Sequence, residues 1–165
     1  MSGLLDKAEA DFLWRFLFSF FLLYAAAHAI DALAPWALAP LKTAIAQAEV
    51  FFLNTIGISA SQQGIVVDAA GLLFAMALEC TGIVLAILLF CLFYATKKSE
   101  RKATPEKIAA SLLLLLAFNL LRVLATIFIA VNFGNTAFEI THALLWVVDS
   151  LAVLLVWVWL VQYKL

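Results

Sequence analysis

Long apolar segments constrain this chain more than any other feature of its sequence. They cover residues 12–33, 82–94, 111–131 and 137–163, and several approach or exceed the roughly 20 residues that a helix needs to cross a bilayer. Hydrophobic residues make up 67% of the chain and charged residues only 13%, whereas soluble domains are nearer half apolar and a quarter charged. We therefore expect an all-α polytopic membrane protein, a helical bundle of roughly four to six transmembrane helices.

Length and charge limit the remaining classes of protein. No polar linker in the 165 residues is long enough to separate two domains, so a single integral membrane domain over residues 1–165 is expected. The formal net charge is −1 and no basic face is present, which argues against nucleic acid as a partner. The H-E-x-x-H pattern of zinc proteases is missing, and we expect no metal and no cofactor.

The first apolar segment, residues 12–33, is interpreted as a permanent spanning helix. A cleaved signal peptide is the alternative, but the preceding residues are net acidic and the apolar segment is long, whereas signal peptides begin with a basic region. His28 and Asp31 lie three positions apart near its far end, which is typical of a polar pair at the membrane interface. Pro35 and Pro40 are expected to bracket a turn.

Residues 41–78 leave two arrangements open. Helical propensity over residues 41–56 is followed by a glycine-punctuated stretch with β-branched residues at 65–67. These features favour an interfacial helix and then a small extracytoplasmic element of hairpin type at about residues 57–78. Two short crossings, Leu41–Ile58 and Ile65–Leu78, are the alternative. Both arrangements leave Cys80 on the same side of the membrane, because two crossings restore the original side.

The distribution of basic residues sets the expected topology. Half of the ten Lys and Arg residues lie in the short segment between the second and third apolar segments, at Lys97, Lys98, Arg101, Lys102 and Lys107. By the positive-inside rule this loop is cytoplasmic. Thr104-Pro105-Glu106 is a helix start, with a hydroxyl cap, a proline at the first position and an acid in the first turn. Both chain termini are then inside, and Cys80 and the polar turn at residues 132–136 are outside.

Three polar side chains are expected at one depth. From the cytoplasmic ends of their helices, Cys80 lies roughly 26 Å away, Arg122 roughly 22 Å and His142 roughly 30 Å, at about 1.5 Å per residue. Each has a plain structural alternative as an apolar filler, a snorkelling cation or an interfacial polar residue. Their shared depth on three helices favours a functional site. Cys91, at mid-membrane depth, is interpreted as a filler, and its 11-residue separation from Cys80 within one helix excludes a disulfide.

The three residue types suit nucleophilic catalysis. Cys80 would begin a helix, whose positive end and a nearby cation favour the nucleophilic thiolate. His142 could take the thiol proton and return it to a leaving amine, and Arg122 could pair with the thiolate, the developing oxyanion or a substrate carboxylate. Glu139, one turn before His142, could orient the imidazole. Asp149, two turns deeper, is expected to be protonated or to bridge helices.

At these residues the sequence resembles the exosortase/archaeosortase family of membrane-embedded cysteine transpeptidases. The resemblance covers roughly residues 45–150 and depends on Glu79-Cys80-Thr81-Gly82-Ile83, on Asn119-Leu120-Leu121-Arg122 and on His142. It implies a Cys–Arg–His active site made of Cys80, Arg122 and His142. Glu79, Asn119 and Glu139 are expected to support that site.

The resemblance also implies substrates and a location. The substrates would be secreted proteins with a carboxy-terminal sorting tail that consists of a short motif, a transmembrane helix and a basic end. Cleavage at the outer face of a prokaryotic cell membrane would leave a thioester on Cys80, and an amine or lipid-derived acceptor would resolve it. Membrane lipids surround the chain. Many family members are longer, so whether this chain transfers or only hydrolyses stays open.

A non-enzymatic membrane subunit for transport or assembly is the alternative function. In that case Arg122, His142 and Asp149 would line a polar pathway. No internal repeat or pair of broken helices supports this alternative. A thiol oxidoreductase would want paired outer cysteines, and only Cys80 is expected outside.

Overall fold

Helices dominate the computed structural model, which describes residues 7–96 and 104–161. Most of the predicted basic loop and both chain termini lie outside the described residues. The elements in chain order are α1 (Lys7–Leu33), α2 (Pro35–Thr55), β1 (Ala60–Gln63), β2 (Val66–Ala69), β3 (Leu72–Ala75), the 3₁₀ helix η1 (Leu78–Thr81), α3 (Ile83–Ala95), α4 (Pro105–Phe133) and α5 (Asn135–Val161).

The membrane character predicted from the apolar segments is confirmed. Among the described residues, α1, α4 and α5 are the helices long and apolar enough to cross a membrane, and α3 is a shorter apolar helix. Many large apolar side chains on these helices are exposed, including Phe21, Leu113 and Leu155. Exposed apolar surface on this scale suits a hydrocarbon environment rather than water.

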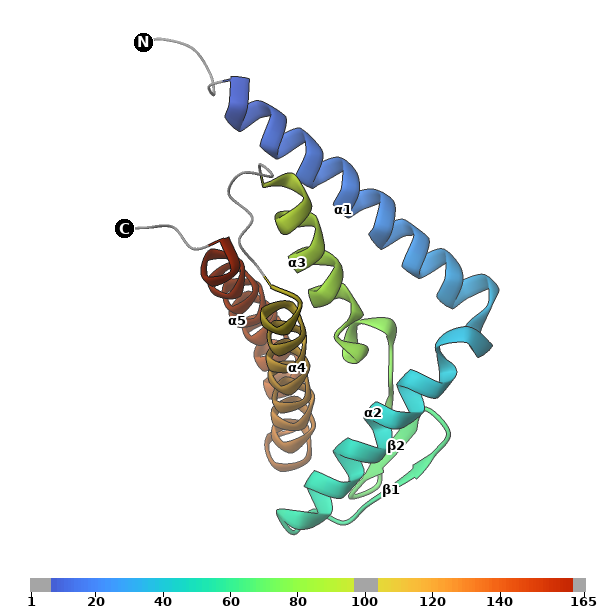
Figure 1. Ribbon diagram of the computed structural model, residues 1–165. Coiled ribbons are helices and arrows are strands. Elements are labelled where there is room, and N and C mark those ends of the chain that lie inside the picture. Colours follow the sequence, from blue (N-terminus) through green and yellow to red (C-terminus); the bar gives the residue numbers. More distant parts are fainter. Residues whose placement is uncertain (1–6, 97–103, 162–165) are drawn as a thin grey trace.

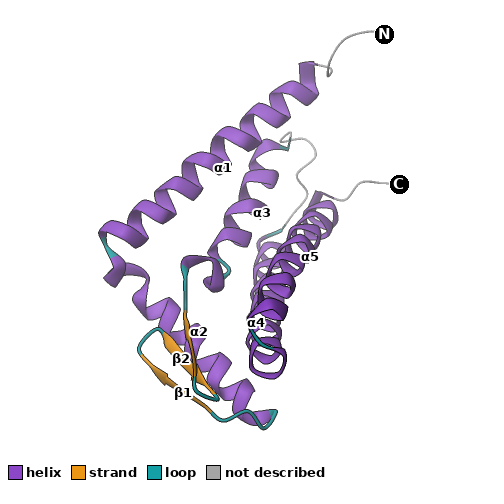
Figure 2. Ribbon diagram, turned by 180° about the vertical axis from the view of Figure 1, so that it is seen from behind, coloured by secondary structure: helices purple, strands orange, loops and turns teal. Residues whose placement is uncertain are grey.

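The helices separate the molecule into two ends. The start of α1, the end of α3, the start of α4 and the end of α5 lie towards one end, in the upper part of Figure 1, while α2 and the sheet lie towards the other. Helix α1 packs against α3, α3 against α5, and α4 against α5. Figure 2 shows the same arrangement from behind.

Helices α4 and α5 form an antiparallel hairpin with a very short connection. The predicted helix start is confirmed, because the Thr104 side chain accepts a hydrogen bond of 3.4 Å from the Lys107 amide. The turn expected over residues 132–136 is shorter than predicted, because α4 continues to Phe133 and α5 begins at Asn135. Gly134 alone joins them, with a φ of +81° that a residue with a Cβ rarely adopts.

The corner between α1 and α2 differs from the sequence expectation. The helix break falls at Ala34, Pro35 takes the first position of α2, and Pro40 lies inside that helix, so the predicted turn between the two prolines is wrong. Proline fits the first position of a helix because a backbone N–H at that position would have no hydrogen-bond partner within the helix. The Lys42 ammonium donates to both oxygens of Asp31, at 2.6 and 2.8 Å, and so joins the end of α1 to α2.

Residues 60–75 form a three-stranded antiparallel sheet in the order β1-β2-β3. The alternative of a membrane crossing over residues 65–78 is therefore wrong, and the predicted small element at about 57–78 is a sheet. The strands have four residues each, about 13 Å at 3.3 Å per residue, which is too short for a crossing. The two hairpin turns contain Gly64 and Gly71 at positive φ, 60° and 85°, as tight turns require.

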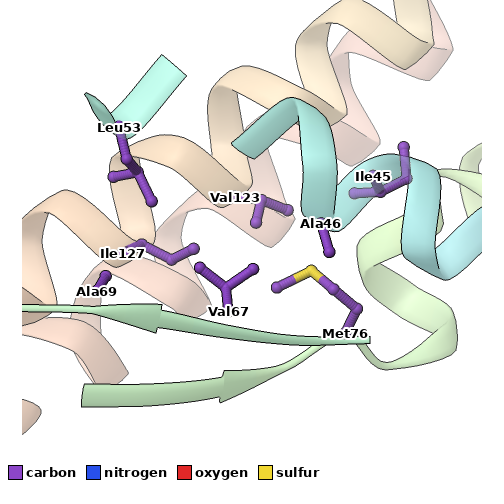
Figure 3. Close-up of a cluster of buried hydrophobic side chains, with 8 residues drawn as sticks. All are labelled: Ile45, Ala46, Leu53, Val67, Ala69, Met76, Val123 and Ile127. Atoms are coloured by element: carbon purple, nitrogen blue, oxygen red, sulfur yellow. The ribbon is translucent and has the colours of Figure 1, made fainter. Parts of the chain in front are cut away.

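One face of the sheet packs against α2 and α4. Burial alternates along β2, where Val67 and Ala69 are fully buried. Figure 3 shows the cluster that they form with side chains of the two helices, composed of Ile45, Ala46, Leu53, Val67, Ala69, Met76, Val123 and Ile127. This cluster holds the sheet against the helices beside the residues that precede α3.

Glu49 of α2 is a fully buried carboxyl group. Neither of its carboxylate oxygens has a hydrogen-bond partner among the described residues. Burial raises the pKa of Glu49 from 4.5 to about 8, because an apolar environment disfavours the charged form. The side chain is therefore mostly protonated at neutral pH.

This raised pKa predicts a pH-dependent stability that Glu49→Gln removes. Between pH 4.5 and about 8 the folded chain keeps a proton that the unfolded chain has lost, so the wild-type stability falls as pH rises through this window. Glutamine cannot lose a proton. We expect the melting temperature in detergent of Glu49→Gln, relative to wild type, to rise steadily across the window.

Glu139→Gln is the matched control, since the Glu139 side chain is exposed. Its melting temperature relative to wild type should change little over the same pH range. A difference between Glu49→Gln and wild type that does not vary with pH would contradict a carboxyl group that is protonated in the folded protein.

Candidate active site

Cys80 lies in the short segment between the sheet and α3. It belongs to η1, which two local hydrogen bonds stabilise. The Cys80 amide donates to the Ala77 carbonyl at 3.1 Å, and the Thr81 hydroxyl donates to the Leu78 carbonyl at 2.6 Å. Gly82 follows at a φ of +78° and separates η1 from α3. The sequence suggested that Cys80 begins the apolar helix. In the structure Cys80 precedes that helix by about one turn.

Two side chains of α4 bind the backbone of this turn. The Asn119 amide donates to the Cys80 carbonyl at 2.6 Å, and the Arg122 guanidinium donates to the Glu79 carbonyl at 2.7 Å. Asn119 and Arg122 are three residues apart and so project from one face of the helix. Both are buried. The structure thus brings Asn119, Arg122, Glu79 and Cys80 together, as the motif residues suggested.

Arg122 also connects α4 to α5. Its Nη1 atom lies 3.2 Å from Oδ2 of Asp149, and both side chains are only 2% exposed. The Arg122 guanidinium lies over the indole ring of Trp146, 4.9 Å from the ring centroid. A buried cation requires such compensation by an anion and an aromatic face. The helix-bridging role expected for Asp149 is the one that the structure shows.

His142 projects from the first half of α5. The indole N–H of Trp146, one turn later, donates to Nε2 of His142 at 3.2 Å, and the imidazole stacks on Phe138 with centroids 5.7 Å apart. In the neutral ring, Nε2 is then the acceptor and Nδ1 carries the proton. Glu139 was expected to orient the imidazole; its carboxylate accepts from Asn135 at 3.1 Å, and no contact between Glu139 and His142 is seen among the described residues.

Cys80, Arg122 and His142 line the same cleft, although they come from three separate parts of the chain. The cleft has a volume of about 230 Å³ and is otherwise bounded by β3, α4 and α5, through Leu73, Phe74, Ala75, Met76, Val123, Thr126, Ile127 and Phe138. Largely apolar walls with a few polar groups resemble the general pattern of small binding sites.

Two contacts near the cleft were not foreseen from the sequence. Nε2 of His28 in α1 lies 3.3 Å from Oε1 of Glu79, while Asp31 accepts from Lys42, so the two residues have separate partners. Trp146 contacts both Arg122 and His142. The spacing of four residues between His142 and Trp146 was a usable signal, whereas nothing in the sequence linked His28 to Glu79.

Burial raises the pKa of the Cys80 thiol above its usual range. A hydrogen bond with the Ala77 backbone and the charge of Arg122 lower this pKa, while the carboxyl groups of Glu79 and Glu49 raise it further. The resting side chain is therefore a thiol, and it needs a base before it can act as a nucleophile. Cys91 in α3 is fully buried, in agreement with its interpretation as a filler.

The arrangement contains the parts of a thiol nucleophile site: a partly exposed cysteine, an imidazole and a fixed guanidinium on one cleft. In the part of the chain that the structure describes, no group of three or more His, Cys, Asp or Glu side chains is placed to hold a metal ion. The chemistry available to these residues is proton transfer, covalent attack by sulfur and stabilisation of negative charge.

The Cys80 environment predicts a specific pH dependence of alkylation. In a Cys91→Ala background, the rate of reaction with iodoacetamide should still be rising at pH 9.0, the ordinary pKa of a cysteine, because only the thiolate reacts. Arg122→Gln removes the nearby positive charge and should move the midpoint to higher pH. Arg122→Lys keeps a charge and should move it less. A rate that is already constant below pH 9.0 would contradict the raised pKa.

Comparison with known proteins gives one clear match. A family model described as transmembrane exosortase matches residues 5–158, which is most of the chain. No curated protein and no solved structure gives a significant match.

Proposed function

Since the chain belongs to the transmembrane exosortase family, we propose that it cleaves the carboxy-terminal sorting tails of secreted proteins through a thioester on Cys80. Membership of this family supports a membrane transpeptidase or protease in general. The observation that carries this proposal is the common cleft of Cys80, Arg122 and His142. All three residues belong to the motifs on which the family resemblance depends.

His142 is the general base in this proposal. It takes the proton of the Cys80 thiol, and the sulfur attacks the carbonyl carbon of a peptide bond next to the transmembrane helix of the tail. The tetrahedral intermediate collapses with transfer of the same proton to the leaving amine, which releases the tail and leaves an acyl thioester on Cys80. A nucleophilic amine, a lipid-derived acceptor or water then resolves the thioester.

Arg122 stabilises negative charge in the same steps. A guanidinium has five N–H donors, and the two contacts to the Glu79 carbonyl and to Asp149 leave others for the cleft that Arg122 lines. These donors would bind the oxyanion of the tetrahedral intermediate. Because Asp149 and the Glu79 carbonyl already hold the guanidinium in position, little reorganisation is needed when charge develops.

We place the site at the outer face of a prokaryotic cell membrane, in one integral membrane domain with both chain termini in the cytoplasm. The basic residues between α3 and α4 support this orientation by the positive-inside rule. The sheet lies at the opposite end of the helices from the start of α4, and η1 follows it, bonded to Asn119 and Arg122 midway along α4. A tail whose basic end stays inside would then present its motif at the level of Cys80.

The alternative of a transport or assembly subunit is less well supported. It requires Arg122, His142 and Asp149 to line one polar pathway. Asp149 is instead buried against Arg122, and it is not among the residues that border the cleft. The paired charges form a structural bridge between α4 and α5.

Replacement of the nucleophile tests the proposal directly. With a tail-bearing substrate in the same membranes, Cys80→Ala and His142→Gln should each lower the rate of tail cleavage by at least about a thousandfold, as losses of a nucleophile or its base do in other enzymes. Cys91→Ala is the control, since it removes the other thiol from a buried position. Tail cleavage at the wild-type rate by a folded Cys80→Ala variant would refute a thioester mechanism.

Labelling tests the orientation. In intact cells that produce the Cys91→Ala variant, a membrane-impermeant maleimide added outside should react with Cys80, which is partly exposed. The double variant that also lacks Cys80 supplies the background signal. If Cys80 reacted only after the membrane had been permeabilised, Cys80 would lie on the cytoplasmic side and the proposed topology would be wrong.

A further inference from the structure

The two edges of the small sheet differ in whether their outward backbone groups have hydrogen-bond partners. In an antiparallel pair, successive residues of an edge strand direct their backbone N–H and C=O alternately to the neighbouring strand and away from it. At the β1 edge, the Asn54 side chain occupies the outward groups of Ala60, donating to its carbonyl at 2.9 Å and accepting from its amide at 3.0 Å. This amide takes the place of a further strand.

The β3 edge has no such cover. The Met76 amide donates to the Ile65 carbonyl at 2.9 Å, and the register pairs Phe74 with Val67. By the same alternation, Phe74 bonds to β2, while the backbone groups of Leu73 and Ala75 point away from the sheet. Both residues are exposed, Leu73 by 72%. Among the described residues, no hydrogen bond reaches these outward groups.

This open edge faces the candidate active site. Leu73, Phe74, Ala75 and Met76 border the cleft that also contains Cys80, so one wall of the cleft is the free side of β3. The chain continues directly from β3 into η1. Exposed strand edges bind extended peptides through their backbone groups, and proteins normally keep such edges short or covered.

We propose that β3 binds the substrate by strand addition: the extended segment of the sorting tail that precedes its transmembrane helix pairs with Leu73 and Ala75 as a fourth strand. This proposal rests on the proposed function. The transmembrane part of a tail cannot be the occupant, because its helix already uses its own backbone groups. An extended polypeptide supplies the alternating donors and acceptors that the edge leaves unpaired.

Strand addition explains how one cleft could act on many secreted proteins. Backbone hydrogen bonds give affinity that is independent of sequence, and alternate side chains of the bound strand enter the cleft, where Phe74 and Phe138 lie with ring centroids 6.1 Å apart.

The strand β3 runs towards η1 and then α3 in the order of the chain. A tail that passes from outside into the membrane runs the same way, so the added strand would be parallel to β3.

Proline substitution at the edge tests the proposal. Leu73→Pro and Ala75→Pro each remove an outward N–H and leave the hydrogen bonds to β2 intact, as proline on an edge strand can. Each should lower kcat/KM for tail cleavage by about tenfold or more, mainly through KM, because a backbone hydrogen bond is lost and the ring obstructs the added strand. The assay is cleavage of a purified tail-bearing substrate in liposomes.

Gln62→Pro is the matched control. Gln62 lies on the opposite edge of the sheet, and its N–H also points away from β2 by the alternation seen at Ala60. It should keep cleavage within about twofold of wild type, since it makes no contact with the substrate. Unchanged KM in both β3 variants, with cleavage abolished by Cys80→Ala, would overturn strand addition while leaving the proposed function intact. No cleavage by the wild-type protein would instead refute the proposed function.

Cross-linking supplies a second measurement that does not depend on turnover. In a Cys80→Ser, Cys91→Ala background, Leu73→Cys should form disulfides with single cysteines placed along the tail segment before its helix. A paired strand predicts cross-links at alternate substrate positions, with the intervening positions weak. Equal cross-linking at consecutive positions, or no cross-linking, would overturn strand addition. This holds even if the proline variants had lost activity because proline disrupted the sheet.

Discussion

The hydrogen bonds from α4 to the carbonyls of Glu79 and Cys80 are the interaction on which the candidate site depends. They hold a short turn at the point where the sheet gives way to α3. Asn119 and Arg122 can reach these two carbonyls because they are three positions apart on one helix. The position of the sulfur is thereby tied to a spanning helix instead of to a loop.

Burial of Arg122 brings a second set of contacts with it. A guanidinium removed from water needs an anion and further hydrogen bonds, and here Asp149, the Glu79 carbonyl and the Trp146 ring supply them. These contacts join η1, α4 and α5. The charge that would serve an oxyanion is therefore the same charge that joins the helices, so its function and the packing of the helix pair are linked.

The sequence predicted the spanning helices, the cap at Thr104 and the shared location of Cys80, Arg122 and His142, because hydropathy, capping and helical rise depend on local residues. It did not predict the contact of His28 with Glu79 or of Lys42 with Asp31, since the first depends on how α1 packs beside η1 and the second on the angle between α1 and α2. It also left the sheet as one of two choices. Four-residue strands with β-branched and small residues look much like a short apolar helix until their glycine turns are resolved.

The Trp146 hydrogen bond has a consequence for the timing of proton transfer. Nε2 of His142 can accept the indole N–H only while that nitrogen has a free lone pair. A proton that arrives at Nε2 displaces the indole, and the same indole ring covers the Arg122 guanidinium. Proton transfer from Cys80 to Nε2 therefore requires the bond to the indole to break, while Asp149 and the Glu79 carbonyl still hold the guanidinium in place.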